Sequence, residues 1–472
     1  MKSGNKIIDG LWLTLLVTGF LFLLNLIPED TKVFGLQLKP VDIVSDLKQD
    51  DEFDYSDYKF QDEQKETDTN NKLLNQYSFQ KQELNQASFF YFGESENNVS
   101  MEDITRKVRI TGNTAQLKFF FDALKQTGSS KIRVAHFGDS GIEGDLITAQ
   151  LREKLQNAYG GKGVGFLSIT SQDVKFRTTT KMDFSNNWET ASVFSSNPKK
   201  YPLGVNGEVF IPKPNSYVEY TATPRKFKNI KTFNTARLFY SDSDNSQVSV
   251  SFDGGSKEIV NLSPSSNVKE LVFDSKKSVK KVRLEFPNTK KGYFYGVSLE
   301  EGNGVYVDNF PLRGNSGSSI KDIPVEKLKD FNKLMNYKLI ILQFGLNVAS
   351  QRQRDFNWYE KEMASVISHL KSAFPNTSIL LISVSDKSVK KGSNFVTDPG
   401  VISLLKAQQS IAESNGIAFW NLFEAMGGPN SMPKWVDSNP PKAFKDYTHF
   451  NLDGAADIAE LLGDALLEAA KK

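Results

Sequence analysis

The sequence predicts an α/β domain with helices on both faces of a parallel sheet, interrupted by an inserted antiparallel β-sandwich. Short aliphatic or β-branched runs recur along the chain, each long enough for one buried strand. Amphipathic helical patterns separate them, and alternating strand and helix is typical of a parallel sheet. Between residues 171 and 305 the apolar residues instead recur with period two between polar turns, which is typical of an antiparallel sandwich. The strand runs are residues 131–136, 338–344, 378–384 and 417–420.

Length and composition exclude several classes of protein. The 472 residues are too many for one ordinary domain. Lys and Arg (58) nearly balance Asp and Glu (56), so a nucleic-acid binder that works through a basic surface is not expected. Cysteine is absent, which excludes disulfides, thiolate zinc sites and cysteine nucleophiles. Only three histidines occur and no group has metal-ligand spacing, so neither a metal nor a cofactor is expected.

The first 30 residues predict a membrane anchor. Residues 10–27 carry no charge and, as a helix, would reach roughly 27 Å, enough to cross a hydrocarbon core. Lys2 and Lys6 precede this segment, so the short N-terminus is expected to stay inside and the rest of the chain to be extracytoplasmic or periplasmic. A cleaved signal peptide and a buried core helix are the alternatives, although no small-x-small cleavage site lies near Ile27.

The remaining chain divides by composition. Residues 31–107 are rich in Asp, Glu, Gln, Asn and Lys without a sustained apolar period, which predicts a disordered polar tether. Beyond it, residues 108–170 and 306–472 are expected to form the two parts of the α/β domain, and residues 171–305 the inserted sandwich.

Polar residues with catalytic potential follow two of the predicted strands. Ser140, in Gly-Asp-Ser, stands on a strand-to-helix turn at the carboxyl end of a buried strand, where ligands of open parallel sheets bind. Asn347 follows the strand at 338–344 and belongs to the same edge. An asparagine amide and glycine N–H groups, such as that of Gly317, are suitable oxyanion donors. Taken singly, Ser140 could be a helix N-cap and the two loops ordinary turns.

A base for the serine is offered near the C-terminus. His449 follows Asp446 by three residues, so the two side chains can meet across one tight turn. A serine nucleophile needs a base, and the base needs a carboxylate that fixes its tautomer. Taken in isolation, these residues indicate an ordinary surface turn whose histidine has no catalytic role.

The four blocks together, Gly-Asp-Ser, a glycine, Gly-x-Asn and Asp-x-x-His, resemble the SGNH (GDSL-type) hydrolase family. The resemblance implies a three-layer, flavodoxin-like sheet over residues 108–170 and 306–470. It also implies that Ser140 is the nucleophile, His449 the base and Asp446 its orienting carboxylate. The implied oxyanion hole is the N–H of Ser140, the N–H of Gly317 and the side chain of Asn347. Val348 departs from the family, which commonly has an acidic residue there.

Such a site implies acyl transfer through an acyl-serine. The layout is similar to bacterial peptidoglycan or polysaccharide O-acetylesterases with a carbohydrate-binding-type insertion. We therefore expect an O-acetylesterase acting on a cell-envelope or exported glycan, with Trp188 as a candidate sugar-stacking residue. The alternatives are an O-acetyltransferase that works with an integral-membrane acyltransferase, and an inactive glycan-binding protein on the same scaffold.

Overall fold

A computed structural model describes residues 104–471 except 196, 224, 225, 245, 289 and 290, together with the backbone of a two-stranded antiparallel pair near the N-terminus. That pair, β1 (Lys32–Val33) and β2 (Leu36–Gln37), belongs to a separate compact unit.

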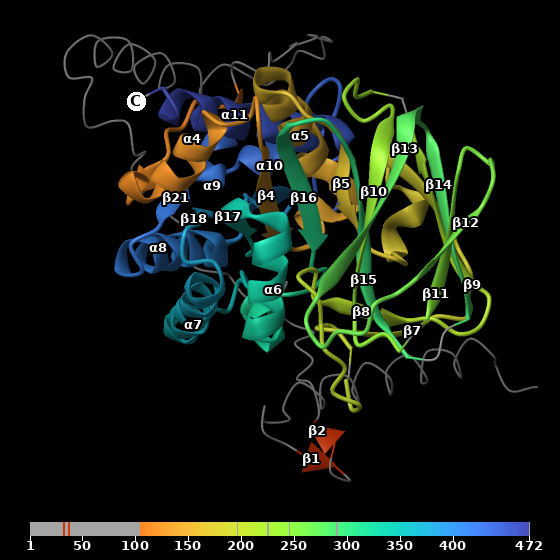
Figure 1. Ribbon diagram of the computed structural model, residues 1–472. Coiled ribbons are helices and arrows are strands. Elements are labelled where there is room, and N and C mark those ends of the chain that lie inside the picture. Colours follow the sequence, from red (N-terminus) through yellow and green to blue (C-terminus); the bar gives the residue numbers. More distant parts are fainter. Residues whose placement is uncertain are drawn as a thin grey trace, which may run out of the picture. The chain divides into compact units, whose positions relative to one another are not determined.

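A six-stranded sheet forms the centre of the α/β part (Figure 1). Five neighbouring strands are parallel, and the short sixth strand pairs antiparallel at one edge. The two central strands are buried over nearly their whole length, as expected for a sheet covered on both faces. In spatial order the strands are β16 (Gly304–Pro311), β4 (Lys131–Gly138), β17 (Tyr337–Gln343), β18 (Ser378–Ile382), β21 (Ala418–Trp420) and β3 (Thr111–Gly112).

Helices cover both faces of this sheet. Along β17, Leu339 and Ile341 belong to the apolar cluster formed with α5 and α11, whereas Ile340 and Leu342 point to the opposite face. Figure 1 shows α5 and α11 together on one side and α6, α7 and α8 on the other. The helices are α4 (Lys118–Leu124), α5 (Leu146–Tyr159), α6 (Val325–Met335), α7 (Asn357–Ala373), α8 (Pro399–Ser414), α9 (Leu422–Ala425), α10 (Ser431–Asp437) and α11 (Leu452–Ala469). Short 3-10 helices are η3 (Thr114–Leu117), η4 (Ser140–Asp145), η5 (Gln172–Lys175) and η6 (Ser318–Asp322).

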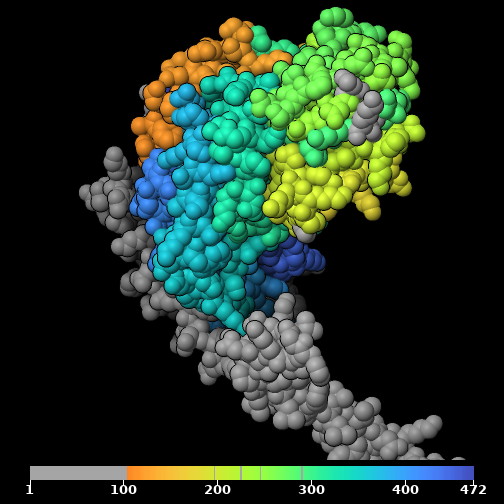
Figure 2. Space-filling model, turned by 60° about the horizontal axis from the view of Figure 1, so that its bottom comes forward, coloured from red at the N-terminus to blue at the C-terminus, as the bar shows by residue number. Residues whose placement is uncertain are grey.

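The stretch with period-two patterning forms two antiparallel sheets with a shared apolar core. In space-filling view these strands, yellow to green, lie directly beside the teal and blue second half of the α/β part (Figure 2). The first sheet holds β13 (Lys269–Val279), β10 (Phe233–Ser241), β15 (Tyr293–Glu301), β8 (Glu208–Ile211) and β7 (Glu189–Ser192), with β5 (Lys162–Leu167) paired to β15. The second holds β12 (Glu258–Asn261), β11 (Gln247–Phe252), β14 (Lys281–Asn288), β9 (Ser216–Ala222) and β6 (Thr180–Phe184).

A buried ion network ties the sandwich to the parallel sheet. Arg133 of β4 donates to both carboxylate oxygens of Asp308 on the neighbouring β16, at 2.9 and 2.8 Å. The same guanidinium also pairs with Glu300 of β15, which belongs to the sandwich. All three side chains are at most 1% exposed. Burial disfavours the charge of Glu300, but Arg133 and its neighbouring cations outweigh burial and hold its pKa far below the usual value. Because an unpaired charge here would be costly, the network holds the insertion in a defined position on the sheet.

The structure differs from the sequence prediction at the borders between these parts. Ile104 is buried, so the packed part extends at least four residues before Val108. Residues 162–167 fall within the range 108–170 predicted for the α/β part, but they form strand β5, which pairs with β15 in the sandwich. The predicted anchor (1–30) and nearly all of the predicted tether (31–107) lie outside the described residues. Within the described part, no helix is both long and apolar enough to span a membrane.

Candidate active site

Ser140, His449 and Asp446 form a hydrogen-bonded chain at the carboxyl edge of the parallel sheet. Ser140 begins η4 directly after β4, and its Oγ lies 3.0 Å from Nε2 of His449. On the other side of the imidazole, Nδ1 lies 2.8 Å from Oδ2 of Asp446. The structure thus brings together side chains that lie 309 positions apart in sequence. The imidazole and carboxylate side chains are 39% and 49% exposed, so the array is open to a large substrate.

The turn that carries Asp446 and His449 is held from several directions. The N–H groups of Thr448 and His449 donate to Oδ1 of Asp446, both at 3.0 Å. Burial acts to raise the pKa of Asp446, but these N–H groups and the imidazole outweigh it and hold the pKa below its usual value. Tyr447 adopts a positive φ of 53°, and its ring stacks on Phe395 of β20 (Asn394–Thr397) with centroids 3.6 Å apart. The carboxylate therefore stays ionised and close to the imidazole.

Asp139 connects the nucleophile turn to the Asn347 turn. Its carboxylate is 3% exposed. Oδ1 accepts from the N–H of Gly141 at 2.9 Å, and Oδ2 accepts from the N–H groups of Gly345 and Leu346 at 3.2 and 3.3 Å. Burial raises the pKa of Asp139 to about 6, against the opposing effect of these donors. The sequence reasoning did not assign a role to this residue, although it stands within the Gly-Asp-Ser tripeptide.

The three predicted oxyanion donors differ in whether they already donate a hydrogen bond within the protein. The N–H of Ser140 is at the first turn of η4, where helical N–H groups lack an intrahelical acceptor. Asn347 is exposed and donates one Nδ2 proton to the carbonyl of Asn315 at 3.3 Å, which leaves its second proton for another acceptor. The single N–H of Gly317, in contrast, donates to Oδ1 of Asn315 at 2.7 Å. The N–H of Gly317 is therefore not free to donate to an oxyanion in this geometry, contrary to the expectation, because it already donates to Asn315.

Glycine is nonetheless required at position 317. Its φ of 93° lies in the left-handed region, and an added Cβ would come within 2.8 Å of the ring of Phe344. The tight approach brings the start of η6 against the end of the strand that precedes Asn347.

The other two histidines do not take part in the hydrogen-bonded array of Ser140, His449 and Asp446. His136 is fully buried on β4, with Nε2 3.0 Å from Oε1 of Gln343 and Nδ1 3.0 Å from Oγ1 of Thr148. Burial lowers the pKa of His136 to about 4, so the ring is neutral at pH 7. His369 on α7 bonds the carbonyl of Ile323 at 2.9 Å and holds η6 against that helix. Both act as structural residues.

Trp188 lies half-buried at the margin of the sandwich core. Its ring packs edge-on against Phe286 with centroids 5.0 Å apart and joins the margin of the sandwich core. Its indole N–H donates to the carbonyl of Tyr217 at 3.3 Å. Its polar sequence neighbours suggested an exposed loop, whereas the ring is half-buried beside the strand that carries Phe286; a role for Trp188 in sugar stacking stays a prediction.

Within residues 104–471 as described, no cluster of His, Asp and Glu side chains could hold a metal ion. The polar groups at the sheet edge are instead a hydroxyl, an imidazole, a carboxylate and N–H donors, the set used for acyl transfer to a serine.

Comparisons with known proteins support the fold. No protein-family model matches this chain, and no curated protein does. A solved structure described as "Peptidoglycan O-acetylesterase in action, 5 min" is 20% identical, with a TM-score of 0.63 over 77% of this chain and 99% of the other. A family two carbohydrate esterase from Cellvibrio japonicus is 10% identical, with a TM-score of only 0.26 over 62% of this chain and 98% of the other. Only the first of these TM-scores indicates a shared fold. The α/β fold expected from the sequence is therefore confirmed, because this chain shares the fold of that solved structure over 77% of its own length.

Proposed function

We propose that this chain is a serine esterase that removes O-acetyl groups from a cell-envelope or exported glycan through an acyl-serine intermediate. The observation that carries the proposal is the continuous chain from Ser140 Oγ to His449 at 3.0 Å and on to Asp446 at 2.8 Å. These distances lie within hydrogen-bond reach, as a nucleophile, its base and the orienting group require.

In the first half of the reaction, Ser140 Oγ attacks the acetyl carbonyl carbon while His449 Nε2 takes the hydroxyl proton. Asp446 holds the proton on Nδ1 and stabilises the imidazolium that forms. The oxyanion accepts hydrogen bonds from the N–H of Ser140 and from the second Nδ2 proton of Asn347. Collapse of the tetrahedral intermediate breaks the ester bond, and the imidazolium gives its proton to the departing sugar oxygen. Water then attacks the acetyl-serine with the same base, which releases acetate and restores Ser140.

The glycan substrate is supported by two features. The fold is shared with a protein described as a peptidoglycan O-acetylesterase. The reacting groups also lie partly exposed at the sheet edge rather than at the bottom of a narrow tunnel, as attack on a polymer requires. Placement outside the cytoplasm rests on the uncharged segment at residues 10–27, with Lys2 and Lys6 before it. The same anchored arrangement would allow a membrane acyltransferase partner and transfer to a sugar hydroxyl, which is the second candidate.

The test is release of acetate from an O-acetylated glycan by the full-length chain. We expect release by the wild type and its loss in Ser140→Ala. Addition of an unacetylated oligosaccharide separates the two candidates, because an esterase gives free acetate whereas an acetyltransferase gives acetylated acceptor faster than acetate. Unchanged acetate release by Ser140→Ala would overturn the serine mechanism. Binding of the glycan without either product would identify a binding protein.

A further inference from the structure

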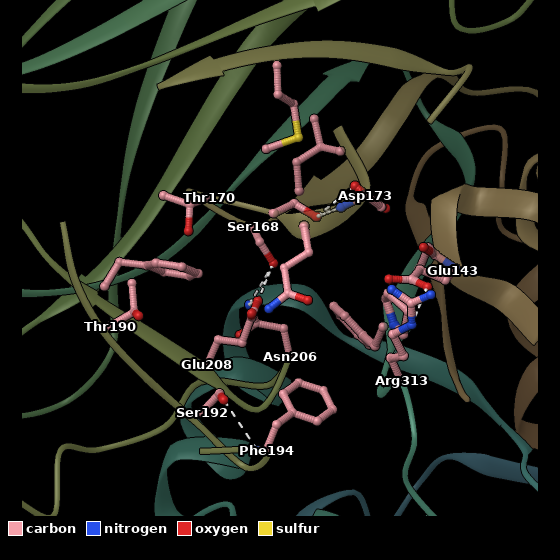
Figure 3. A pocket seen from close by; sticks show the side chains of 18 of the residues that line it. Glu143, Ser168, Thr170, Asp173, Thr190, Ser192, Phe194, Asn206, Glu208 and Arg313 are labelled. Atoms are coloured by element: carbon pink, nitrogen blue, oxygen red, sulfur yellow. Dashed lines mark hydrogen bonds and ion pairs between the residues drawn. The ribbon is translucent and has the colours of Figure 1, made fainter. Parts of the chain in front are cut away.

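A cavity of about 550 Å³ lies between the sandwich and the edge of the parallel sheet (Figure 3). Its volume falls within the range of small-molecule sites, roughly 300–1,000 Å³. One wall comes from the sandwich strands β6, β7 and β8, and the other from Glu143 of η4 and the end of β16. Neither the triad nor the oxyanion donors line it, so it is a separate space.

The cavity begins next to the nucleophile. Glu143 follows Ser140 by three residues and lies at a kink within η4. Pro311, which also lines the cavity, pairs with Gly138 of β4, two residues before Ser140. Since neighbouring strands lie about 4.8 Å apart, the cavity opens one strand away from the nucleophile's own strand. A chain-like substrate with its ester at Ser140 could therefore extend into it.

One wall of the cavity contains hydrogen-bond acceptor atoms to which no described residue donates a hydrogen bond. Asn206 is 4% exposed and uses its amide nitrogen for Ser168 and Glu208, both at 3.0 Å, while its Oδ1 has no partner among the described residues. Oε2 of Glu208 accepts from Ser168 at 2.6 Å, and the described part of the chain gives its other oxygen no hydrogen bond. Figure 3 shows Ser168, Asn206 and Glu208 gathered together in the cavity. A buried acceptor without a donor is costly, so a ligand that brings O–H or N–H groups would be stabilised there.

The charges on the walls favour a neutral ligand. The two arginines are each paired with a carboxylate, Arg313 with Glu143 at 3.3 Å and Arg177 with Asp173 at 2.8 Å. Among the described residues no cation pairs with Glu208, so nothing beside it would attract an anionic ligand. Burial raises the pKa of Glu208 to about 7, so its carboxylate is only partly ionised and attracts a cation weakly. The ligand class that remains is neutral and rich in donors.

Aromatic side chains line the cavity beside these acceptors. Phe194 is 45% exposed, an unusual state for so large an apolar ring, and it lies at the cavity in Figure 3. Phe184 of β6 and Phe210 of β8 line the same space. Pyranose rings combine hydroxyl donors on their edge with an apolar C–H face, which matches this pairing of acceptors and aromatic rings.

We infer that this cavity is a subsite for a sugar residue that neighbours the acetylated one, with its donors on Asn206 and Glu208 and its C–H face on Phe194. The inference rests on the proposed function for its biological setting. It moves glycan recognition from Trp188, which packs in the sandwich margin, to the junction between the sandwich and the sheet.

The first test compares two ester substrates in variants of the full-length chain. Phe194→Ala and Glu208→Gln should each lower kcat/KM on an O-acetylated tetrasaccharide of N-acetylhexosamines about tenfold, mainly through KM. Aryl acetate, which is too short to enter the cavity, should react within about twofold of wild type. Ile259→Ala is the matched control, because Ile259 is 62% exposed on β12 of the same sandwich and does not line the cavity. Equal loss on both substrates, or none on the tetrasaccharide, would overturn the subsite.

A binding measurement separates failure of the subsite from failure of the proposed function. A β-1,4-linked N-acetylglucosamine tetrasaccharide without O-acetyl groups is titrated calorimetrically into Ser140→Ala, with and without Phe194→Ala. We expect saturable binding that weakens about tenfold in the double variant. If this binding is observed but the wild-type chain releases no acetate from any substrate, the subsite is kept and the esterase is refuted. Acetate release that depends on Ser140 together with binding insensitive to Phe194 would refute the subsite and keep the esterase.

Discussion

Asp139→Asn tests whether one buried carboxylate positions two sides of the site. The wild-type carboxylate accepts from Gly141 through one oxygen and from Gly345 and Leu346 through the other. An asparagine has only one acceptor oxygen, and its NH₂ group would face an N–H donor on the other side. At least one hydrogen bond to a charged acceptor is lost, worth about 1.5–3 kcal/mol, and one turn must move.

The stability of this variant should change little, because a second effect opposes the first. A pKa raised from 3.8 to about 6 means that the ionised carboxylate costs the folded state about 3 kcal/mol at pH 7, a cost that neutral asparagine lacks. The loss of a hydrogen bond and the removal of this charge act in opposite directions on stability. We therefore expect the free energy of unfolding in urea to stay within about 2 kcal/mol of the wild type.

Activity should respond far more strongly than stability. Displacement of the Asn347 turn or of the Ser140 turn by about 1 Å is expected to lower kcat on aryl acetate roughly 100-fold. The control is Asp330→Asn, since Asp330 is a buried carboxylate on α6 that accepts the N–H of Val268 at 3.0 Å, away from Ser140. It should leave kcat unchanged. A kcat for Asp139→Asn within threefold of wild type would refute the positioning role.

Three further predictions follow from the same geometry. Ser140→Ala and His449→Ala should each reduce kcat on aryl acetate by several orders of magnitude, and the double variant should be scarcely worse than either, because the residues act as one unit; additive losses would show that they do not. Asn347→Ala should cost about 10²–10³ in kcat with little change in KM, as for a donor used in the transition state; an effect on KM alone would make it a substrate-binding residue. His136 has its pKa lowered to about 4 in the folded state, so its contribution to stability is present above pH 6.5 and is lost as the pH falls toward 4, by about 3 kcal/mol. The free energy of unfolding in urea, measured from pH 7 to 4, should therefore correspond to uptake of one proton fewer in His136→Gln than in the wild type. The same pH dependence in both chains would contradict a neutral buried ring.

The order of strands and helices could be predicted because the central strands are buried on both faces. The run at 338–344 contains four consecutive aliphatic residues, 339–342, and the structure has β17 there. The same reasoning missed β16 as a strand, since Asp308 and Asn309 interrupt its apolar run. Both are buried, but Asp308 is paired with Arg133 and Asn309 donates to Thr148 at 2.8 Å. A polar residue with a distant partner carries no local sign of its burial.

Strand β5 was missed for a different reason. Gly163 and Gly165 have φ of 101° and 79°, and two such glycines in the sequence predict a turn. In the fold they permit close pairing with β15, because an added Cβ at Gly163 would come within 2.3 Å of the carbonyl oxygen of Leu299. The groups that would meet an added Cβ, the Leu299 carbonyl at Gly163 and the Asp308 carboxylate at Gly165, lie more than 100 residues away in the sequence.

The candidate site divides in the same way. Ser140, Asp446 and His449 could be found from motif order and strand ends, and the structure places them within hydrogen-bond distance. Asp139 could not be assigned, because its partners Gly345 and Leu346 lie 206 and 207 positions away. The cavity beside β16 was likewise invisible, since its walls come from loops whose positions depend on how the sandwich packs against the sheet.

The proposal of an acyl-serine is tested most directly by trapping the intermediate. The full-length chain is mixed with excess aryl acetate, quenched in acid within one turnover, digested and examined by peptide mass spectrometry. We predict that the peptide containing Ser140 gains the mass of one acetyl group, and that the gain is absent in Ser140→Ala. Acetate release at the wild-type rate with no acetyl group on Ser140 at any quench time, or with the acetyl group on another residue, would contradict the mechanism.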